Sequence, residues 1–367
     1  MKSRKIIFAG GGTAGHIQPA LAVARLWRQA HPSDQIIFLG TSSGLETKLV
    51  PDAGFDLHLI TRVRVPRSLS LDLLKVPLSL LRSISESRKI LREADLLIGF
   101  GGYVCAPAYL AARLQKVPTV IHEANAEPGW ANRLGAHFTD ALAVGLPVNH
   151  GPFTDALITG LPLRDDITSV LVTHRNADES TWGQIREQAK RDLGIDPKNK
   201  VILVFGGSQG SQAINSVIEN VRQGVNQKSI SIVHSVGASN VLPTSHEKYL
   251  AFSYIENMAT AYLAADLVIA RSGAITCSEV RALAKYALFI PLPIGNGEQS
   301  VNADHLVEMG RAQVVDQKTF TPTWLLDNMD SMLARSDHFG DLPDFADLEA
   351  AGKILALAEH QVIVGRK

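Results

Sequence analysis

The chain has 367 residues, of which 46% are hydrophobic and 20% charged, and its formal net charge at pH 7 is zero. This composition is that of an ordinary globular protein and excludes a disordered chain, while the length predicts two domains rather than one core. No stretch approaches the ~18 apolar residues of a transmembrane helix, no signal peptide is visible, and a nucleic-acid partner is not expected. Cys105 and Cys277 lack metal-ligand spacing, which predicts reduced thiols in a cytoplasmic protein.

In the first half, short apolar runs alternate with helical patterns, which predicts a parallel sheet with helices on both faces. Strands are expected at 5–9, 35–40, 56–60, 95–98, 118–121 and 140–144, and helices at about 16–30, 69–92, 104–115 and 129–136. Glycines and prolines between Gly145 and Arg164 mark a domain boundary. Residues 165–199 are polar and poorly patterned, apart from a short charged helix at about 183–193.

The second half restarts the alternation. Strands are expected near 201–205, 230–234, 267–270, 287–290 and 312–315, and helices near 210–222, 257–265, 274–285, 299–309 and 321–335. The last helical stretch, Phe345 to Gln361, has too few neighbours in its own half and is expected to pack back on the first domain. We therefore expect an α/β protein with two doubly wound parallel-sheet domains, 1–163 and 164–341, and a C-terminal helix within 342–367.

Two glycine-rich turns stand far apart in the chain. Residues 10–16 read Gly-Gly-Gly-Thr-Ala-Gly-His and residues 206–210 read Gly-Gly-Ser-Gln-Gly. Each follows an apolar run and precedes a helical pattern, so each presents backbone N–H groups and the positive end of a helix to an anion such as phosphate. Two such units predict two domains facing each other across a cleft. For either turn alone, a tight turn without a ligand remains the alternative.

Residues 10–15 also match the Gly-x-Gly-x-x-Gly dinucleotide pattern, which alone is weak evidence. A dinucleotide site needs an acidic residue after the second strand, but residues 40–43 are Gly-Thr-Ser-Ser, and Glu46 lies well into the following turn. His16 would crowd a bound pyrophosphate, so the sequence argues against NAD. The same imidazole is a candidate general base, because its unperturbed pKa lies near neutral pH; the alternative is that it braces the turn.

A third strand-to-helix turn follows the apolar run 267–269. Its residues 272–274, Ser-Gly-Ala, are expected to present N–H groups to an anion. Glu279, on the helix that follows, could accept both hydroxyls of a ribose, or it could simply be favoured by the helix dipole. Downstream, residues 297–302 (Gly-Glu-Gln-Ser-Val-Asn) suit the hydroxyls of a neutral sugar.

Polar residues also close apolar runs in the first half, at 101–103 (Gly-Gly-Tyr) and 122–125 (His-Glu-Ala-Asn). Open α/β sheets bind ligands at the carboxyl ends of their strands, which makes both segments candidates for binding. A structural pairing of Glu123 with His122 or Arg133 is the alternative for that carboxylate.

A basic, leucine-rich stretch lies between Arg62 and Arg92, where eight basic residues face only Asp72 and Glu86. Leucines and cations recur here at helical spacing. An interfacial helix facing anionic lipid explains both, whereas a helix that merely covers the domain is the alternative. The residues that define this candidate membrane segment are Leu74, Lys75, Leu78, Leu81 and Arg82.

These motifs, in this order over nearly the whole chain, resemble the MurG family, the undecaprenyl-diphospho-muramoylpentapeptide N-acetylglucosaminyltransferases of bacterial cell-wall synthesis. The matching landmarks are residues 11–16, 101–103, 122–125, 206–210, 271–274 with Glu279, and Gln299 with Asn302. The resemblance implies a GT-B fold, with the active site between two Rossmann-like domains. It implies an inverting transfer of N-acetylglucosamine from UDP-GlcNAc to the 4-hydroxyl of the muramoyl sugar of lipid I, giving lipid II.

The resemblance also implies roles for particular residues. In the second domain, Ile255 would meet the uracil through its backbone and Glu279 would hold the ribose. Gln299 and Asn125 would touch the N-acetylglucosamine. Facing the donor diphosphate would be Ser208, Arg164, Ser272, Gly273 and Ala274. The first domain would hold the acceptor and its diphosphate, with His16 as the base, near Gly12, Thr13, Ala14, Gly15, Gly101, Gly102 and Tyr103. Of these, Thr13 and Gly15 would also reach the donor.

The leucine-rich basic stretch matches the family's membrane-association region, which implies a peripheral protein on the cytoplasmic face of the cell membrane. The implied partners are UDP-GlcNAc, undecaprenyl-linked lipid I, anionic lipid and other cell-wall synthesis proteins. No Asp-x-Asp motif stands at a strand end, so neither a catalytic metal nor a cofactor is expected. Helix-end amides with Arg164 would stabilise the departing UDP.

Four positions depart from the family's usual pattern: Ala14, Ala124, Leu161 and Glu298. These four differences bear on how the sugars would be contacted more than on whether the chain catalyses transfer. Two alternatives remain open at this point. One is another UDP-sugar enzyme of the same architecture, such as a glycolipid glycosyltransferase or a UDP-GlcNAc 2-epimerase. The other is a non-catalytic UDP-sugar-binding protein.

Overall fold

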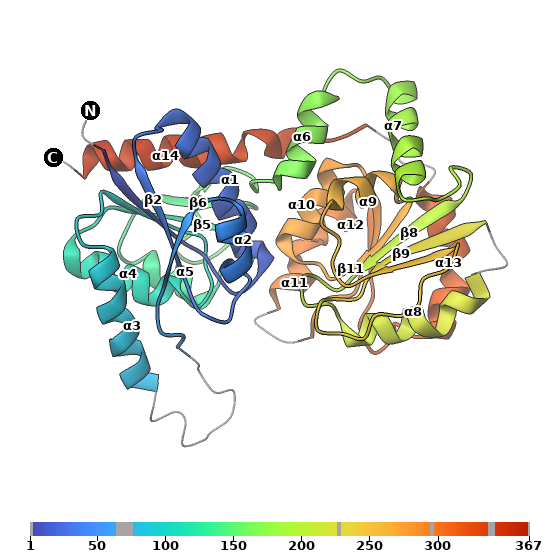
Figure 1. The fold of residues 1–367 in the computed structure, drawn as a ribbon, viewed down its shortest axis with the longest axis horizontal. Coiled ribbons are helices and arrows are strands. Elements are labelled where there is room, and N and C mark those ends of the chain that lie inside the picture. The colour runs from blue at the N-terminus through green and yellow to red at the C-terminus, as the bar shows by residue number, and fades with distance from the viewer. Residues whose placement is uncertain (1–2, 64–75, 226–228, 294–296, 337–341, 366–367) are drawn as a thin grey trace. The chain divides into compact units, whose positions relative to one another are not determined.

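The computed structural model describes residues 3–63, 76–225, 229–293, 297–336 and 342–365. The chain divides into two compact units (Figure 1). Unit 1 comprises Met1–Arg164 and Asp347–Lys367, and unit 2 comprises Asp165–Ala346. Each unit is a parallel sheet flanked by helices, as the alternation of strands and helices predicted.

Unit 1 contains a seven-stranded parallel sheet in the order β3-β2-β1-β4-β5-β6-β7. Its strands are β1 (Lys5–Ala9), β2 (Gln35–Gly40), β3 (Asp56–Leu59), β4 (Leu96–Gly99), β5 (Thr119–Glu123), β6 (Leu142–Val144) and β7 (Leu157–Ile158). Its first helices are α1 (Ala14–Ala30), α2 (Glu46–Asp52), α3 (Val76–Ile90), α4 (Cys105–Gln115) and α5 (Trp130–Gly135). Ile6 and Phe8 of β1 join the core on one face of the sheet and Ile7 and Ala9 the core on the other, because successive strand residues point to opposite faces.

The C-terminal helix belongs to unit 1. A 3₁₀ turn, η2 (Ala346–Glu349), leads into α14 (Ala350–Val364). Ile354, Ala358 and Val362 lie one helical turn apart and are buried in the same core as Trp27 of α1. The described part of unit 1 therefore has one of its cores completed by a segment from the far end of the chain.

Unit 2 contains a six-stranded parallel sheet in the order β10-β9-β8-β11-β12-β13. Its strands are β8 (Lys200–Phe205), β9 (Ile230–Ser235), β10 (Tyr249–Phe252), β11 (Leu267–Ala270), β12 (Tyr286–Phe289) and β13 (Ala312–Val314). Its helices are α6 (Asp165–Thr173), α7 (Glu179–Asp192), α8 (Gln212–Val225), α9 (Met258–Ala264), α10 (Ala274–Ala282), α11 (Glu298–Asn302), α12 (Asp304–Glu308) and α13 (Pro322–Ser336).

Four elements were not predicted: α2, α6, β7 and β10. The apolar stripe of α6 has only two buried members, Ile167 and Leu171, one turn apart, which is too short a pattern to stand out from a polar segment. β10 is four residues long and depends on its pairing with β9, a non-local contact. In addition, α7 begins at Glu179 rather than near 183. The Asp178 side chain caps this earlier start by accepting a hydrogen bond from the Thr181 amide.

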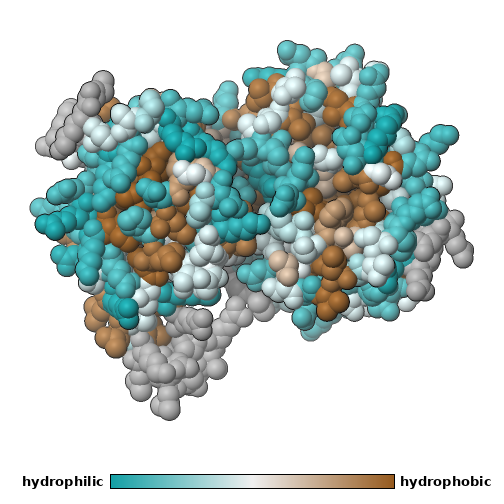
Figure 2. Space-filling view, viewed as in Figure 1, coloured by the Kyte–Doolittle hydropathy of each residue, from teal (hydrophilic) through white to brown (hydrophobic). Residues whose placement is uncertain are grey.

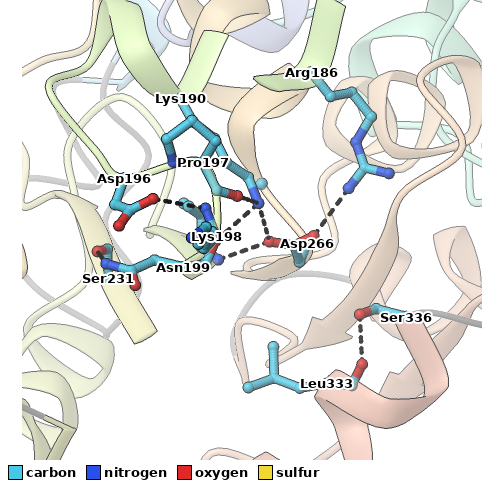
Figure 3. Close-up of polar contacts among 12 residues, drawn as sticks. Arg186, Lys190, Asp196, Pro197, Lys198, Asn199, Ser231, Asp266, Leu333 and Ser336 are labelled. Carbon is cyan, nitrogen blue, oxygen red and sulfur yellow. Dashed lines mark hydrogen bonds and ion pairs between the residues drawn. The ribbon is translucent and has the colours of Figure 1, made fainter. Parts of the chain in front are cut away.

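A buried ionic cluster ties α7 to two strands of unit 2 (Figure 3). The Asp266 carboxylate, just before β11, lies 3.0 Å from Lys190 Nζ and 3.0 Å from an Arg186 guanidinium nitrogen. It also accepts a hydrogen bond from the Val201 amide of β8 at 2.8 Å. Burial by itself would raise the pKa of Asp266, but Lys190, the Val201 amide and Arg186 together hold that pKa below its usual value.

Because two histidines are buried, we expect the free energy of unfolding to fall in mild acid. Burial lowers the pKa of His122 in unit 1 and of His234 in unit 2 from 6.5 to about 4. Between these pH values the unfolded chain binds protons that the folded chain does not, so stability is lost as the pH falls from 6.5 towards 4. The loss is on the order of 3 kcal/mol for each histidine. Urea unfolding at pH 7 and at pH 5 measures the part of this loss that appears above pH 5, about 2 kcal/mol for each histidine.

A matched control uses His137, which is exposed on unit 1. The substitution His137→Gln should leave the acid-dependent loss of stability unchanged, because it removes neither buried ring. Equal free energies of unfolding at pH 7 and pH 5 for the wild type would show that neither buried ring stays neutral.

Candidate functional site

Both units place their glycine turns where the strand order reverses. In unit 1, β1 and β4 are neighbours, and in unit 2, β8 and β11 are neighbours. Open α/β sheets bind ligands beyond the carboxyl ends of the strands at such a switch point. The first glycine turn follows β1, and the Gly101–Tyr103 turn follows β4; the second glycine turn follows β8, and the Ser272–Ala274 turn follows β11. Each unit therefore offers one candidate binding edge.

The first glycine turn is not a row of bare N–H groups. The Gly12 amide donates to Glu46 Oε2 at 2.9 Å. The other carboxylate oxygen accepts from the Thr41 amide at 2.8 Å and the Thr41 hydroxyl at 3.0 Å, and Glu46 is fully buried. The expectation of a bare amide is therefore wrong at Gly12. The amides of Ala14 and Gly15, at the first two positions of α1, have no acceptor within the helix and suit an anion.

His16 lies at the start of α1, directly above this turn. Its Nδ1 is 3.2 Å from the Gly11 carbonyl oxygen and 3.2 Å from the Thr13 hydroxyl. A Cβ at Gly101 would stand 3.1 Å from the ring's Cδ2 and 3.3 Å from its Nε2. The structure thus brings His16 against the turn that follows β4, at the switch point of unit 1.

The Gly101-Gly102 turn needs glycine at both positions. Their φ angles are +94° and +88°, in the region that other residues rarely adopt. A Cβ at Gly102 would also lie 2.3 Å from the Gly11 carbonyl oxygen, so the two glycine turns pack directly on one another. Tyr103 is 43% exposed, and the Arg62 guanidinium lies 5.4 Å from its ring centroid.

Glu123 organises the loop after β5. Its carboxylate accepts hydrogen bonds from the Asn125 amide (2.9 Å), the Asn125 side chain (3.0 Å), the Gly129 amide (3.0 Å) and Asn132 Nδ2 (2.9 Å). Pairing with His122 or Arg133, the alternative drawn from the sequence, is not what the structure shows; His122 Nε2 instead lies 3.2 Å from the Gly160 carbonyl oxygen. Asn125 is therefore held in place by a buried acid.

In unit 2, Arg271 binds the protein itself. Its guanidinium is buried and donates to the carbonyl oxygens of Ile290 and Pro291 at 2.9 and 3.0 Å, and to the Ser211 hydroxyl at 2.8 Å. Desolvation lowers the pKa of Arg271. This residue fixes the segments after β8, β11 and β12 relative to each other, a role that the sequence did not reveal.

The Ser272 hydroxyl is also engaged, donating to the Gln299 carbonyl oxygen at 2.6 Å. Asn302 Nδ2 donates to the Ser272 carbonyl oxygen at 3.2 Å, and Gln299 Oε1 accepts from the Leu292 amide at 3.0 Å. The structure thus joins the Ser272 turn to α11. Gly273 is the N-cap of α10 and no side chain caps that helix, which leaves its first amides suited to an anion.

Glu279 lies in the second turn of α10 and is 4% exposed. Its Oε2 accepts a hydrogen bond from the Tyr262 hydroxyl at 2.9 Å. Tyr262 lies on α9, which begins three residues after Ile255. The Tyr262 hydroxyl therefore connects Glu279, the acid predicted to hold the ribose, with helix α9. That helix begins just after Ile255, the residue predicted to meet the uracil.

The residues predicted for the donor are divided between the units. Ser208, Ile255, Ser272, Gly273, Ala274, Glu279 and Gln299 belong to unit 2, and Thr13, Gly15, Asn125 and Arg164 belong to unit 1. Of the candidate membrane segment, Leu74 and Lys75 lie outside the described residues, whereas Leu78, Leu81 and Arg82 lie on α3.

Helix α3 presents two of its three leucines outwards, and the third, Leu80, is half-buried. Leu78 and Leu81 are 73% and 64% exposed, while the buried residues of the helix are Ser83 and Ser87. Figure 2 shows hydrophobic residues at the surface over this helix. Arg82 is exposed and its Nε lies 3.0 Å from Glu86 Oε1. A helix that covered the domain in the ordinary way would bury its leucines instead.

One departure from the family pattern has a packing explanation. Leu161 is 2% exposed, and a Cβ at Gly145 would lie 2.6 Å from its side chain. Its amide donates to Asp347 at 3.2 Å. The leucine therefore fills space inside unit 1.

Comparisons with known proteins agree with this architecture. Residues 6–144 match the glycosyltransferase family 28 N-terminal domain, and residues 201–341 match the glycosyltransferase family 28 C-terminal domain. These two matches place the chain in the class of family 28 glycosyltransferases.

Comparison with individual relatives identifies the family more narrowly. The chain is 43% identical over 323 residues to the UDP-N-acetylglucosamine--N-acetylmuramyl-(pentapeptide) pyrophosphoryl-undecaprenol N-acetylglucosamine transferase of Corynebacterium diphtheriae, covering 87% of this chain and 85% of that protein. It is 42% identical over 336 residues to the transferase of that name from Streptomyces coelicolor, covering 90% and 89%. The crystal structure of Acinetobacter baumannii MurG aligns with a TM-score of 0.69 at 26% identity, covering 97% and 99%. The chain belongs to this family of transferases, the MurG family.

Proposed function

We propose that this chain transfers N-acetylglucosamine from UDP-GlcNAc to the 4-hydroxyl of the muramoyl sugar of lipid I, giving lipid II with inversion at the anomeric carbon. The observation that carries the proposal is the 42–43% identity, over most of both proteins, to transferases named for this donor and acceptor. A UDP-GlcNAc 2-epimerase from Neisseria meningitidis shares the fold at 15% identity, which supports the architecture alone.

The donor belongs to the binding edge of unit 2 in this proposal. The uncapped start of α10, residues 272–274, would take the diphosphate together with Ser208 and Arg164. Negative charge builds on the β-phosphate as UDP departs, and amides at a helix end stabilise such charge without having to reorganise. Glu279, held by Tyr262, would accept from the ribose hydroxyls, and the Ile255 backbone would meet the uracil. Gln299 and Asn125 would contact the transferred sugar.

The acceptor belongs to the binding edge of unit 1. Its diphosphate would meet the first amides of α1, at Ala14 and Gly15, and the Gly101–Tyr103 turn. His16 would take the proton of the 4-hydroxyl as that oxygen bonds to the anomeric carbon. The bond from that carbon to the UDP oxygen breaks at the same time, and its electron pair leaves with UDP.

We further propose that α3 docks the protein on the cytoplasmic face of the membrane through anionic lipid. The outward-facing Leu78 and Leu81 and the exposed Arg82 support this, because an interfacial helix combines apolar contact with basic charge. Among the described residues, no helix has the length and apolar character needed to cross a membrane. Other cell-wall synthesis proteins are further candidate partners at that surface.

The test is transfer of labelled N-acetylglucosamine from UDP-GlcNAc to a short-chain lipid I analogue in detergent, without added metal. We expect a product with a β1,4 linkage. Binding of UDP-GlcNAc without transfer would retain the donor site and reject this acceptor. Failure to bind UDP-GlcNAc would reject the proposed function.

A further inference from the structure

We propose that Glu46 is a positioning residue for His16, acting through a single peptide group. This inference rests on the proposed function, in which His16 is the base. In the sequence, Glu46 lies beyond the position at which an acid would hold the ribose of a dinucleotide. The structure places its carboxylate beneath the first glycine turn instead.

Three glycines make room for this carboxylate. A Cβ at Gly44 would overlap its oxygens, a Cβ at Gly40 would lie 2.6 Å from Glu46 Cγ, and a Cβ at Gly11 would lie 3.0 Å from Oε1. None of the three has a positive φ. Their common feature is therefore the space they leave for Glu46, which is a more specific use of glycine than a tight turn requires.

The peptide group between Gly11 and Gly12 joins the acid to the imidazole. Its N–H donates to Glu46 Oε2 at 2.9 Å, and its carbonyl oxygen lies 3.2 Å from His16 Nδ1. Because a peptide group is planar, fixing the direction of its N–H also fixes the direction of its C=O. Glu46 thereby sets where the Gly11 carbonyl oxygen points.

The Gly11 carbonyl oxygen determines which ring nitrogen carries the proton. A carbonyl oxygen can only accept a hydrogen bond, so the neutral ring donates to it from Nδ1–H. The Thr13 hydroxyl, also 3.2 Å from Nδ1, can act as an acceptor as well. Nε2 is then the unprotonated nitrogen, the one able to take a proton from a substrate hydroxyl. A carboxylate that orients a catalytic imidazole normally does so directly; here one backbone amide stands between them.

A glutamine at position 46 would break this connection. Glutamine offers one acceptor oxygen and one NH₂ group, whereas three donors converge on the Glu46 carboxylate: the Gly12 amide and the amide and hydroxyl of Thr41. The glutamine oxygen satisfies two of them by facing Thr41, which turns its NH₂ group towards the Gly12 amide. The Gly11-Gly12 peptide would then lose its acceptor and its fixed orientation.

The experiment reads the His16 tautomer by two-bond ¹H–¹⁵N NMR on protein labelled with ¹⁵N-histidine, with His16→Ala assigning the signal. In the wild type we expect a protonated Nδ1 and an unprotonated Nε2. In Glu46→Gln we expect a mixture of tautomers and a kcat lowered roughly 10- to 100-fold, with the KM for UDP-GlcNAc unchanged.

The matched control is Glu86→Gln. Glu86, also in unit 1, accepts hydrogen bonds from the amide (2.6 Å) and hydroxyl (3.0 Å) of Thr61, much as Glu46 does from Thr41. Its hydrogen-bond partners are Thr61 and Arg82, not the glycine turn. The same substitution there should leave the His16 tautomer unchanged.

A second variant, Gly44→Ala, displaces the Glu46 carboxylate without removing its charge, and is expected to produce the same tautomer mixture. A wild-type His16 spectrum in both Glu46→Gln and Gly44→Ala would overturn the proposal, whatever happens to turnover. Full transfer activity in His16→Ala would instead reject the base role of His16, while the NMR result would still decide whether Glu46 positions the ring.

Discussion

The substitution His16→Ala is expected to lower the kcat of transfer by roughly 10²- to 10⁴-fold, the usual contribution of a positioned general base. The imidazole is the group that the structure brings to the switch point of unit 1, against Gly101 and above the first glycine turn. Without it, the acceptor hydroxyl would have to lose its proton to water during attack. The measurement is steady-state transfer to the lipid I analogue, together with calorimetric binding of UDP-GlcNAc.

The control for this prediction is His137→Ala, since His137 is exposed and lies outside both glycine turns. It should transfer at the wild-type rate. UDP-GlcNAc should bind to His16→Ala with nearly wild-type affinity, because most residues proposed for the donor belong to unit 2. Unchanged turnover in His16→Ala would mean that another group takes the proton.

The substitution Asp266→Ala is expected to cost about 3–5 kcal/mol of unfolding free energy, the typical cost of breaking a buried ion pair by removing one partner. The carboxylate faces Lys190, Arg186 and the Val201 amide (Figure 3). Removing it leaves the Lys190 ammonium, which is 9% exposed, without its counter-charge. The remaining hydrogen bonds of the Lys190 ammonium go to uncharged carbonyl oxygens, including that of Asn199 at 2.9 Å.

The same helix provides a matched control. Glu187 pairs with Arg191 on α7 at 2.8 Å, but both side chains are about half exposed. Glu187→Ala should change stability by less than about 1 kcal/mol, because water screens an exposed pair. Urea unfolding of both variants separates the cases. A cost for Asp266→Ala no larger than that for Glu187→Ala would show that the buried cluster contributes no more than a surface pair.

The parallel sheets were predictable because their central strands are continuous apolar runs bounded by glycine or polar residues. β1 and β8 coincide with their predicted ranges to within a residue. β10 was not predictable in this way, since four residues have no period of their own and their pairing partner, β9, is distant along the chain. Helix α6 was not predicted for a related reason, because two buried residues do not make a recognisable apolar stripe.

In the candidate site, too, features set by local sequence could be predicted, whereas features set by distant contacts could not. The glycine turns and His16 could be found because strand, turn and helix follow one another directly in the sequence. Glu46 could not be assigned a partner, because the amide that it binds lies 34 residues away and glycines that make space look the same in a sequence as glycines that turn a chain. Arg271 was noticed as part of a motif, but its partners at residues 211, 290 and 291 meet it only in the folded unit.

The return of the chain from unit 2 to unit 1 has a consequence for the order in which the protein is made. Residues 165–346 form a continuous segment, so unit 2 has all of its chain once the ribosome has passed position 346. Unit 1 begins earlier but lacks Ile354, Ala358 and Val362 until α14 is synthesised, which leaves an apolar face of its first-made strands and α1 uncovered in the meantime. The half that is translated first is therefore the half completed last, and the nascent chain has to keep that face from aggregating throughout the synthesis of unit 2.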